Sequence, residues 1–168
     1  YIRPEGMSVA AWCEEKTAEL EAKILEVGAG HVAAFIAEPI LASGGVIVPP
    51  EGYHKRCLEI CRQHDVLYRS DEVVTAFGRL GEFFASESVF GIVPDIITSA
   101  KGITSGYVPL GAVLISDRLM AELTADDRSE VLFSNGFTYS AHPVSCAAAL
   151  KNIEIMEREE IFAHVRDI

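Results

Sequence analysis

Short apolar runs alternate with amphipathic segments along most of this chain, and this alternation constrains the fold more than any other feature of the sequence. Residues 32–37 form a continuously apolar run that ends at Glu38, and residues 51–64 carry apolar side chains at helical spacing before a second apolar run at 66–68. A short run that is apolar at every position is typical of a strand covered on both faces. Strand, helix and strand in this order predict a parallel βαβ unit.

The pattern continues on both sides of this unit. Residues 8–27 have helical spacing and stop at Gly28-Ala29-Gly30, residues 95–99 and 110–116 are predicted strands, and the polar segment 124–130 is a predicted surface loop. Residues 143–159 are a predicted helix whose apolar side would be Ala147, Ala148, Leu150, Ile153, Ile155 and Met156. We therefore expect one α/β layer structure with a mostly parallel sheet flanked by helices.

Composition excludes several classes of protein. With 168 residues, 49% hydrophobic and 23% charged, the chain is far from the composition of disordered proteins. The formal net charge is −11, and no cluster of Lys and Arg is visible, which argues against nucleic acid or an anionic membrane as a partner. The most apolar stretch, residues 32–48, is interrupted by Glu38, Pro39, Ser43 and a glycine pair, so we expect no membrane span.

The four cysteines, at positions 13, 57, 61 and 146, show no CxxC spacing. Cys57 and Cys61 fall one helical turn apart, where a metal pair is conceivable but two half-buried structural thiols are the preferred interpretation. We expect reduced cysteines, no metal site and a cytoplasmic location, since no leader pattern is visible at Tyr1. Because the chain opens on Tyr1 and closes on Ile168 within a helical pattern, we also expect it to be an excerpt of a longer protein.

Polar residues follow three of the predicted strands. Glu38 follows the first, Asp71 the second and Lys101 the third. Ligands of open α/β sheets bind outside the carboxyl ends of the strands, so these side chains should converge on one edge. A lysine there can form a Schiff base, or it can be an ordinary solvated lysine. An aspartate there can face a ligand, or it can accept backbone N–H groups of the following turn, and position alone leaves both pairs of alternatives open.

The motifs taken together are more specific. The run 43–50 (Ser-Gly-Gly-Val-Ile-Val-Pro-Pro), the residues 70–73 (Ser-Asp-Glu-Val) with 76–79 (Ala-Phe-Gly-Arg), the residues 99–102 (Ser-Ala-Lys-Gly) and the residues 136–140 (Gly-Phe-Thr-Tyr-Ser) occur in one order. In that order and at that spacing, they resemble the class III aminotransferases, pyridoxal-phosphate enzymes of fold type I. The resemblance extends over nearly the whole chain, from about residue 32 to residue 168.

The resemblance implies roles for individual residues. Lys101 matches the lysine that holds pyridoxal 5'-phosphate as an internal aldimine and then shuttles a proton. Asp71 matches the carboxylate that keeps the pyridine nitrogen protonated. Val73, two positions further along what should be an extended strand, matches the aliphatic residue packed on the ring. Thr138, with Phe137 beside it, matches the residue that reaches the cofactor phosphate of the neighbouring subunit, which implies a homodimer or a higher homo-oligomer.

The resemblance also implies what the chain represents. Residues 1–168 would be an internal fragment of the large, aspartate-aminotransferase-like cofactor-binding domain, without its N-terminal segment, its phosphate loop and the C-terminal small domain. Ser43 stands where ornithine-type and γ-aminobutyrate-type members have a glutamate, so the chain looks more similar to the amine:pyruvate or ω-amino acid:pyruvate branch. Three small departures from the family pattern, at Ala76, Asn135 and Ala141, leave the catalytic set intact.

The implied function is therefore transfer of an amino group from an amine or ω-amino acid to pyruvate or a related keto acid. An aminomutase or decarboxylase of the same family is an alternative, and so is a non-catalytic, degenerate subunit. A nicotinamide-binding Rossmann domain is excluded because no GxGxxG follows the first strand, and a serine hydrolase is excluded because GxSxG is absent.

Overall fold

A computed structural model describes residues 3–125 and 136–168 of the chain. The helices are α1 (Val9–Val27), α2 (Tyr53–Gln63), α3 (Ala85–Ser88), α4 (Asp117–Leu123), α5 (Pro143–Arg158) and α6 (Ile161–Asp167), with 3-10 turns η1 (Ala29–His31) and η2 (Lys101–Thr104). The strands are β1 (Ala34–Ala37), β2 (Leu67–Asp71), β3 (Ile96–Ser99) and β4 (Ala112–Ile115). Within the described ranges, none of the helices combines the length and hydropathy that crossing a bilayer requires.

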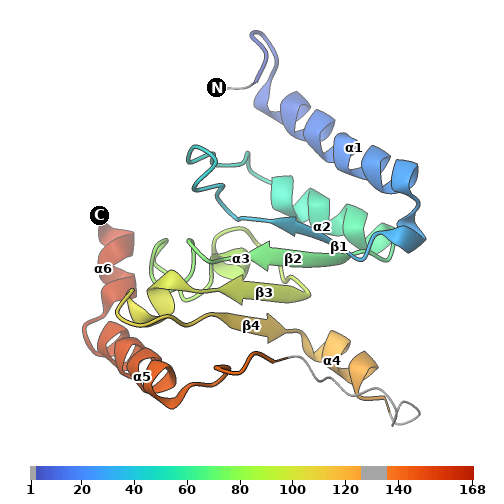
Figure 1. The fold of residues 1–168 in the computed structure, drawn as a ribbon. Coiled ribbons are helices and arrows are strands. Elements are labelled where there is room, and N and C mark those ends of the chain that lie inside the picture. The colour runs from blue at the N-terminus through green and yellow to red at the C-terminus, as the bar shows by residue number, and fades with distance from the viewer. Residues whose placement is uncertain (1–2, 126–135) are drawn as a thin grey trace.

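The four strands form one sheet in the order β1-β2-β3-β4 (Figure 1). β1 is parallel to β2 and β2 is parallel to β3, so the predicted βαβ unit is confirmed as β1-α2-β2. β4 runs antiparallel to β3, because the connection between them holds only the short turn η2 and no helix that crosses the sheet. The expectation of an α/β structure with a mostly parallel sheet is therefore confirmed.

The expectation that the first strand is covered on both faces is wrong for the described residues. β1 is an edge strand, and the side chain of Ile36 is 49% exposed. The central strand β2 alternates between half-buried and buried positions instead. A continuous apolar run reports low polarity but not the position of its strand in the sheet.

The hydrophobic core lies between β1 and β2 on one side and the helices α1 and α2 on the other. Its buried members are Ile24, Cys57, Leu58, Ile60, Cys61, Val66, Tyr68 and Ile92. Cys57 and Cys61 are fully buried rather than half-buried, and burial raises the pKa of Cys57 to about 12 and that of Cys61 to about 11. Both are therefore protonated at neutral pH, as expected of packing residues.

Local sequence explains the ends of the two core helices. The Ser8 hydroxyl caps α1 by accepting the N–H of Ala11, and Gly28 ends it with a φ of 87° that glycine adopts without strain. α2 begins at Tyr53, two residues later than the helical spacing predicts, because Gly52 is in the left-handed region. The predicted ends of both helices are otherwise within two residues of the observed ones.

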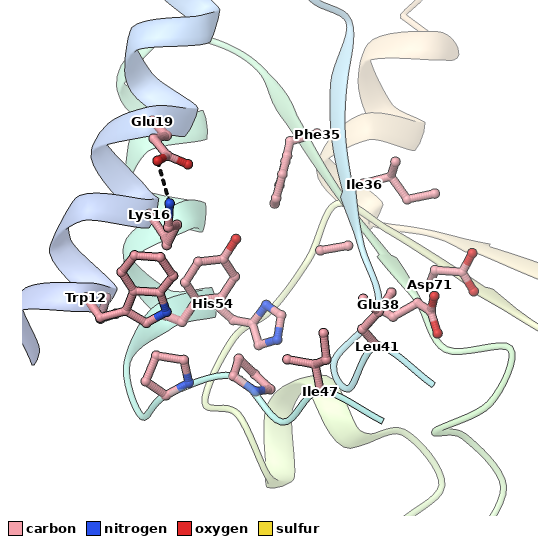
Figure 2. Close-up of a pocket in the computed structure, with 15 residues that line it drawn as sticks. Trp12, Lys16, Glu19, Phe35, Ile36, Glu38, Leu41, Ile47, His54 and Asp71 are labelled. Atoms are coloured by element: carbon pink, nitrogen blue, oxygen red, sulfur yellow. Dashed lines mark hydrogen bonds and ion pairs between the residues drawn. The ribbon is translucent and has the colours of Figure 1, made fainter. Parts of the chain in front are cut away.

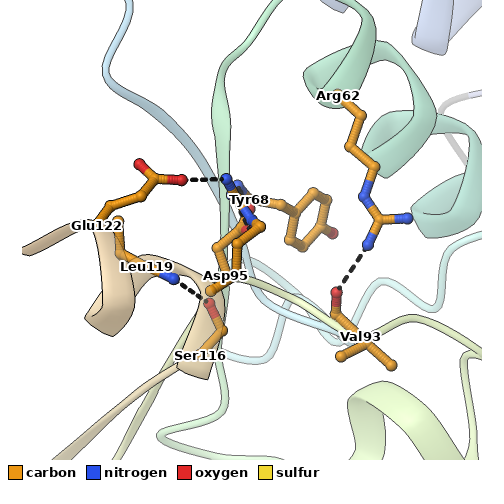
Figure 3. A network of polar contacts seen from close by, with 8 residues as sticks. Arg62, Tyr68, Val93, Asp95, Ser116, Leu119 and Glu122 are labelled. Atoms are coloured by element: carbon orange, nitrogen blue, oxygen red, sulfur yellow. Dashed lines mark hydrogen bonds and ion pairs between the residues drawn. The ribbon is translucent and has the colours of Figure 1, made fainter. Parts of the chain in front are cut away.

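Asp95 ties three elements together at the end of the sheet opposite the predicted site (Figure 3). Its Oδ2 accepts the N–H of Tyr68 at 2.8 Å, and its Oδ1 accepts the Arg118 guanidinium at 2.7 Å. Its backbone carbonyl also accepts the N–H of Ser116, the residue that caps α4. A nearly buried carboxylate thus fixes β2, β3 and α4 at their junction.

The predicted apolar side of α5 is partly wrong. The buried residues are Ser145, Ala149 and Met156, whereas Leu150 is 71% exposed and Ala147 is also exposed. The physical reason is that α5 packs against the polar turn η2, so the face that is covered includes hydrophilic side chains. α5 ends at Arg158, and α6 is a separate helix after Glu160, which has a φ of 52°. Asn135 and the greater part of the predicted loop 124–130 lie outside the described residues.

Candidate functional site

The carboxyl ends of the parallel strands bring the predicted site residues to one edge of the sheet. Ala37 of β1 is level with Ser70 of β2, so the next residues, Glu38 and Asp71, are neighbours, as Figure 2 shows. Asp71 is in turn level with Thr98 of β3, and Lys101 comes three residues later. The predicted convergence of two carboxylates and one lysine on this edge is confirmed at the level of topology.

A pocket of about 590 Å³ opens beside the two carboxylates. Its walls come from α1, β1, α2 and the segment that follows β1, with Glu38 and Asp71 at one end and Trp12 at the other (Figure 2). Most of the lining is aromatic or aliphatic, and its charged or ionisable side chains include Lys16, Glu19, Glu38, His54 and Asp71. That combination is typical of pockets that take small molecules.

Asp71 closes a small turn on its own backbone. Its Oδ1 accepts the N–H of Val73 at 3.1 Å, while no described residue donates to its Oδ2. Val73 itself lies beyond the strand, since β2 ends at Asp71. The prediction that Val73 shares an extended strand with Asp71 is therefore wrong, although Val73 is half-buried directly beside the carboxylate.

Glu72 is a structural residue, although it lies between two predicted site residues. Its side chain is fully buried, and it accepts the backbone N–H groups of Ala85 at 2.7 Å and Ser86 at 2.9 Å. The hydroxyl of Ser86 donates to the same carboxylate at 2.5 Å. Glu72 thus fixes the start of α3 against the end of β2 and holds the turn that follows Asp71.

Lys101 lies at the first position of η2 with a φ of 43°. A non-glycine residue in the left-handed region costs about 1–3 kcal/mol, and such residues cluster at functional sites. Lys101 lines a second hollow of about 360 Å³ together with Thr104, Tyr107 and Leu110. Its carbonyl accepts the N–H of Gly106, so the strained residue is held by the turn that follows it.

Gly102 shows why the residue after the lysine is small. A Cβ atom on Gly102 would lie 2.9 Å from the Cβ of Phe77 and 3.3 Å from the carbonyl oxygen of Ala76. Phe77 has a φ of 55°, so two strained turns press against each other here. The 76–79 motif and the 99–102 motif, which are far apart in sequence, are in direct contact for this reason.

His54 is a residue of the pocket wall that sequence reasoning missed. It is buried on α2, its Nε2 lies 2.9 Å from the carbonyl oxygen of Pro39, and its Nδ1 lies 2.8 Å from the hydroxyl of Tyr68. Burial lowers the pKa of His54 below its ordinary value of 6.5. The indication in the sequence was a histidine at the start of an apolar helical stripe, which is consistent with a satisfied core histidine.

Phe137 and Thr138 lie in an exposed turn before α5. Phe137 is 86% exposed, and its N–H donates to the hydroxyl of Ser140 at 2.9 Å. Neither residue lines the two hollows beside Asp71 and Lys101. The prediction that Thr138 serves the site of a neighbouring subunit stays a prediction.

Comparisons with known proteins agree on one family. The sequence profile described as "Aminotransferase class-III" matches residues 3–168. The chain is 48% identical over 155 residues to "Putrescine--pyruvate aminotransferase" of Pseudomonas aeruginosa, covering 92% of this chain and 32% of that protein. It is 45% identical over 149 residues to "Probable gamma-aminobutyrate transaminase 2, mitochondrial" of Oryza sativa subsp. indica, covering 89% of this chain and 30% of that protein.

A solved structure gives the same answer for the fold. The omega transaminase from Pseudomonas jessenii in complex with PMP superposes with a TM-score of 0.90 at 39% identity, covering 97% of this chain and 36% of that one. The chain thus spans about a third of the length of the curated relatives it matches.

Proposed function

The chain belongs to the class III aminotransferases, and from this premise we propose that the complete protein transfers an amino group from an amine or ω-amino acid to pyruvate or a related keto acid. One observation carries the proposal. Asp71 is the last residue of β2, Lys101 follows the carboxyl end of the adjacent parallel strand β3, and Lys101 is held in a strained backbone conformation.

The family depends on pyridoxal phosphate, and the residues present fit that group. The Oδ2 of Asp71 accepts no hydrogen bond from a described residue. The buried hydroxyl of Ser99, two residues before Lys101, also has no hydrogen-bond partner among the described residues. Polar groups left unpaired at the edge of a sheet suit a polar ligand. When bound, the cofactor supplies an electron sink for the substrate carbon.

The roles proposed for this chain's residues are those that the family motifs imply, and they are compatible with the residues' chemistry. Lys101 would hold the cofactor covalently through Nζ and would move a proton to and from the substrate carbon. Asp71 would hold the cofactor at its ring nitrogen and would keep a proton there. Val73 would pack on the ring, and Thr138, with Phe137, would hold the phosphate in the site of a second subunit of a homodimer or higher homo-oligomer.

The substrate assignment rests on Ser43 and on the relatives' names. Ser43 is exposed beside the glycine pair 44–45, and it supplies no carboxylate to pair with an arginine. One relative is named for putrescine and pyruvate, a donor and an acceptor of the proposed classes. The other is named for γ-aminobutyrate, which is an ω-amino acid, and Ser43 is the feature that favours the amine:pyruvate branch over that type. An aminomutase or a decarboxylase of the same family would use Lys101 and Asp71 as well. A non-catalytic subunit could keep both residues and lack turnover.

We further propose that residues 1–168 form the middle of the large cofactor-binding domain. The phosphate loop and the small domain would come from the rest of the complete protein, which the coverage of one third supports. A cytoplasmic location is supported by the four cysteines, which are all free.

The first experiment tests the cofactor site in the complete protein. Purified protein should show a visible or near-ultraviolet band that borohydride removes, and Lys101→Ala should lack it. Asp71→Asn should keep the covalent attachment but lose most of the turnover, because the ring nitrogen loses its anionic partner. A protein that shows no borohydride-sensitive band after incubation with pyridoxal phosphate would contradict the proposal.

The second experiment tests the reaction. Alanine formation from pyruvate is measured with a panel of monoamines, diamines and ω-amino acids. Formation with at least one donor supports the transaminase. A borohydride-sensitive band without alanine from any donor would leave the cofactor site intact and favour the aminomutase, the decarboxylase or the non-catalytic subunit.

A further inference from the structure

The turn that carries Lys101 is held from outside by one side chain of α5. Asn152 donates from Nδ2 to the carbonyl oxygen of Gly102 at 2.9 Å and to that of Ile103 at 3.2 Å. Its Oδ1 accepts the hydroxyl of Ser105 at 2.7 Å. Three hydrogen bonds thus connect one residue to η2 and the residue that follows it, across about fifty positions of sequence.

The orientation of the Asn152 amide is fixed by its partners. Backbone carbonyls can only accept hydrogen bonds, so the NH₂ group must face Gly102 and Ile103. A flipped amide would place Oδ1 against two carbonyl oxygens and lose both bonds. The contact with Ser105 then completes the set of partners, because a hydroxyl can donate to Oδ1.

The turn that Asn152 contacts is strained at both ends. Lys101 begins η2 with a φ of 43° and Ser105 follows it with a φ of 49°, both in the left-handed region. Such conformations persist only where the surroundings determine them. On one side Gly102 lies against Phe77, and on the other side Asn152 binds the carbonyls, so η2 is clamped between the 76–77 turn and α5.

Asn152 lies on the face of α5 that packs against η2. Ser145, Ala149, Asn152 and Met156 share one face of α5, and the other three are its buried residues. In Figure 1, η2 lies between the end of β3 and α5. The helix therefore directs a polar amide from its packed face toward the backbone next to Lys101.

We propose that Asn152 is a positioning residue that sets the direction of the Lys101 side chain toward the cofactor. The proposal rests on the proposed function, since it gives Asn152 a task only if Lys101 is the attachment point. Asn152 acts through the carbonyls of Gly102 and Ile103, and it does not itself contact the reacting atoms. Displacement of a reacting group by about 1 Å can cost roughly a hundredfold in rate, so the anchor matters beyond its contribution to folding.

Asn152→Asp is the most informative variant because it is nearly isosteric. It keeps an acceptor for Ser105 but turns an oxygen toward two carbonyls. Asn152→Ala removes all three bonds and remains usable if the aspartate variant does not fold. Ser105→Ala removes only the bond to Oδ1, and Lys151→Ala is the matched control, because Lys151 is the preceding residue of α5 and pairs with Glu154 on the exposed side.

The test uses the complete protein, stripped of cofactor and then mixed with pyridoxal phosphate well below its melting temperature. Both Asn152 variants should form the borohydride-sensitive band roughly tenfold or more slowly than the wild type, with kcat reduced and KM for the amine nearly unchanged. Hydrogen exchange at residues 102–106 of the cofactor-free protein should be roughly tenfold faster, the factor expected when a net hydrogen bond is lost. Lys151→Ala should match the wild type in each measurement, and Ser105→Ala should fall between.

The outcomes separate this proposal from the function itself. A wild type without the band contradicts the proposed function whatever the variants do. A normal wild type with Asn152 variants that form the band at the same rate overturns the positioning role. Variants with a lower melting temperature but unchanged band formation and kcat also overturn it, since Asn152 would then be a structural residue only.

Discussion

His54 and Tyr68 form a buried hydrogen-bonded pair in which the direction of the bond is determined. The Nε2 of His54 faces the carbonyl oxygen of Pro39 and must carry the proton, so Nδ1 of the neutral ring accepts the Tyr68 hydroxyl at 2.8 Å. The pair joins α2, β2 and the segment after β1, and His54 lines the same pocket as Glu38 and Asp71.

Because His54 is buried in this pair, we expect the free energy of unfolding to fall in mild acid. Burial lowers the folded-state pKa of His54 below its ordinary value of 6.5, so the unfolded chain binds the proton first as the pH falls. The contribution of His54 is complete above pH 6.5 and is lost as the pH falls from there toward the lower folded pKa, with a slope of at most about 1.4 kcal/mol per pH unit. Melting temperature measured against pH should show the decline in the wild type.

His54→Gln is the matched variant for this measurement. Glutamine can donate to Pro39 but does not titrate, so the decline between pH 6.5 and more acidic values should become shallower. An unchanged profile in His54→Gln would assign the acid sensitivity to other groups.

Asp95 should matter far more than its ion-pair partner. Asp95→Asn leaves the Tyr68 N–H and the Arg118 guanidinium poorly paired at a nearly buried position, and we expect a loss of about 1–3 kcal/mol. Arg118 is 57% exposed, so Arg118→Met should cost less than about 1 kcal/mol. Urea unfolding compares the two variants, and equal losses would show that the ion pair, not the bond to β2, dominates.

Glu72 should behave as a structural carboxylate. Glu72→Gln places an NH₂ group among the donors of Ala85 and Ser86, and we expect a loss of about 1–3 kcal/mol in unfolding free energy. Glu87→Gln, on an exposed position of the same helix α3, is the control and should change stability by less than about 0.5 kcal/mol. Full stability of Glu72→Gln would contradict the assigned role.

Gly102 should be intolerant of even one methyl group. Gly102→Ala brings a Cβ to 2.9 Å from the Cβ of Phe77, and relieving that overlap should cost about 1–3 kcal/mol. It should also slow covalent attachment of the cofactor, because the backbone of Lys101 must shift. Gly30→Ala, where an added Cβ meets nothing within 4 Å, is the control. Melting temperature measures the loss of stability, and borohydride fixation measures the attachment of the cofactor. A normal rate of fixation in Gly102→Ala would show that the steric overlap does not disturb Lys101.

The sequence by itself determined the helices α1, α2 and α5, the four strands in their order, the βαβ unit and the strand ends that carry Glu38, Asp71 and Lys101. These features depend on local periodicity and on the rule that parallel strands present their carboxyl ends at one edge. The order and spacing of the motifs at 70–73, 76–79 and 99–102 also indicated the family, since order and spacing can be read along the chain.

Only the tertiary structure decided what the neighbours of those residues do. Asp71 and Glu72 are adjacent acidic residues, yet Asp71 lines the pocket whereas Glu72 is buried. The carboxylate of Glu72 accepts backbone N–H groups at the start of α3, thirteen and fourteen positions away. Val73 leaves the strand, β1 is an edge strand, and Asn152 reaches back to the turn of Lys101 from fifty positions away. The physical reason is that burial and hydrogen bonding are satisfied by partners remote in sequence, and periodicity within a segment carries no information about them.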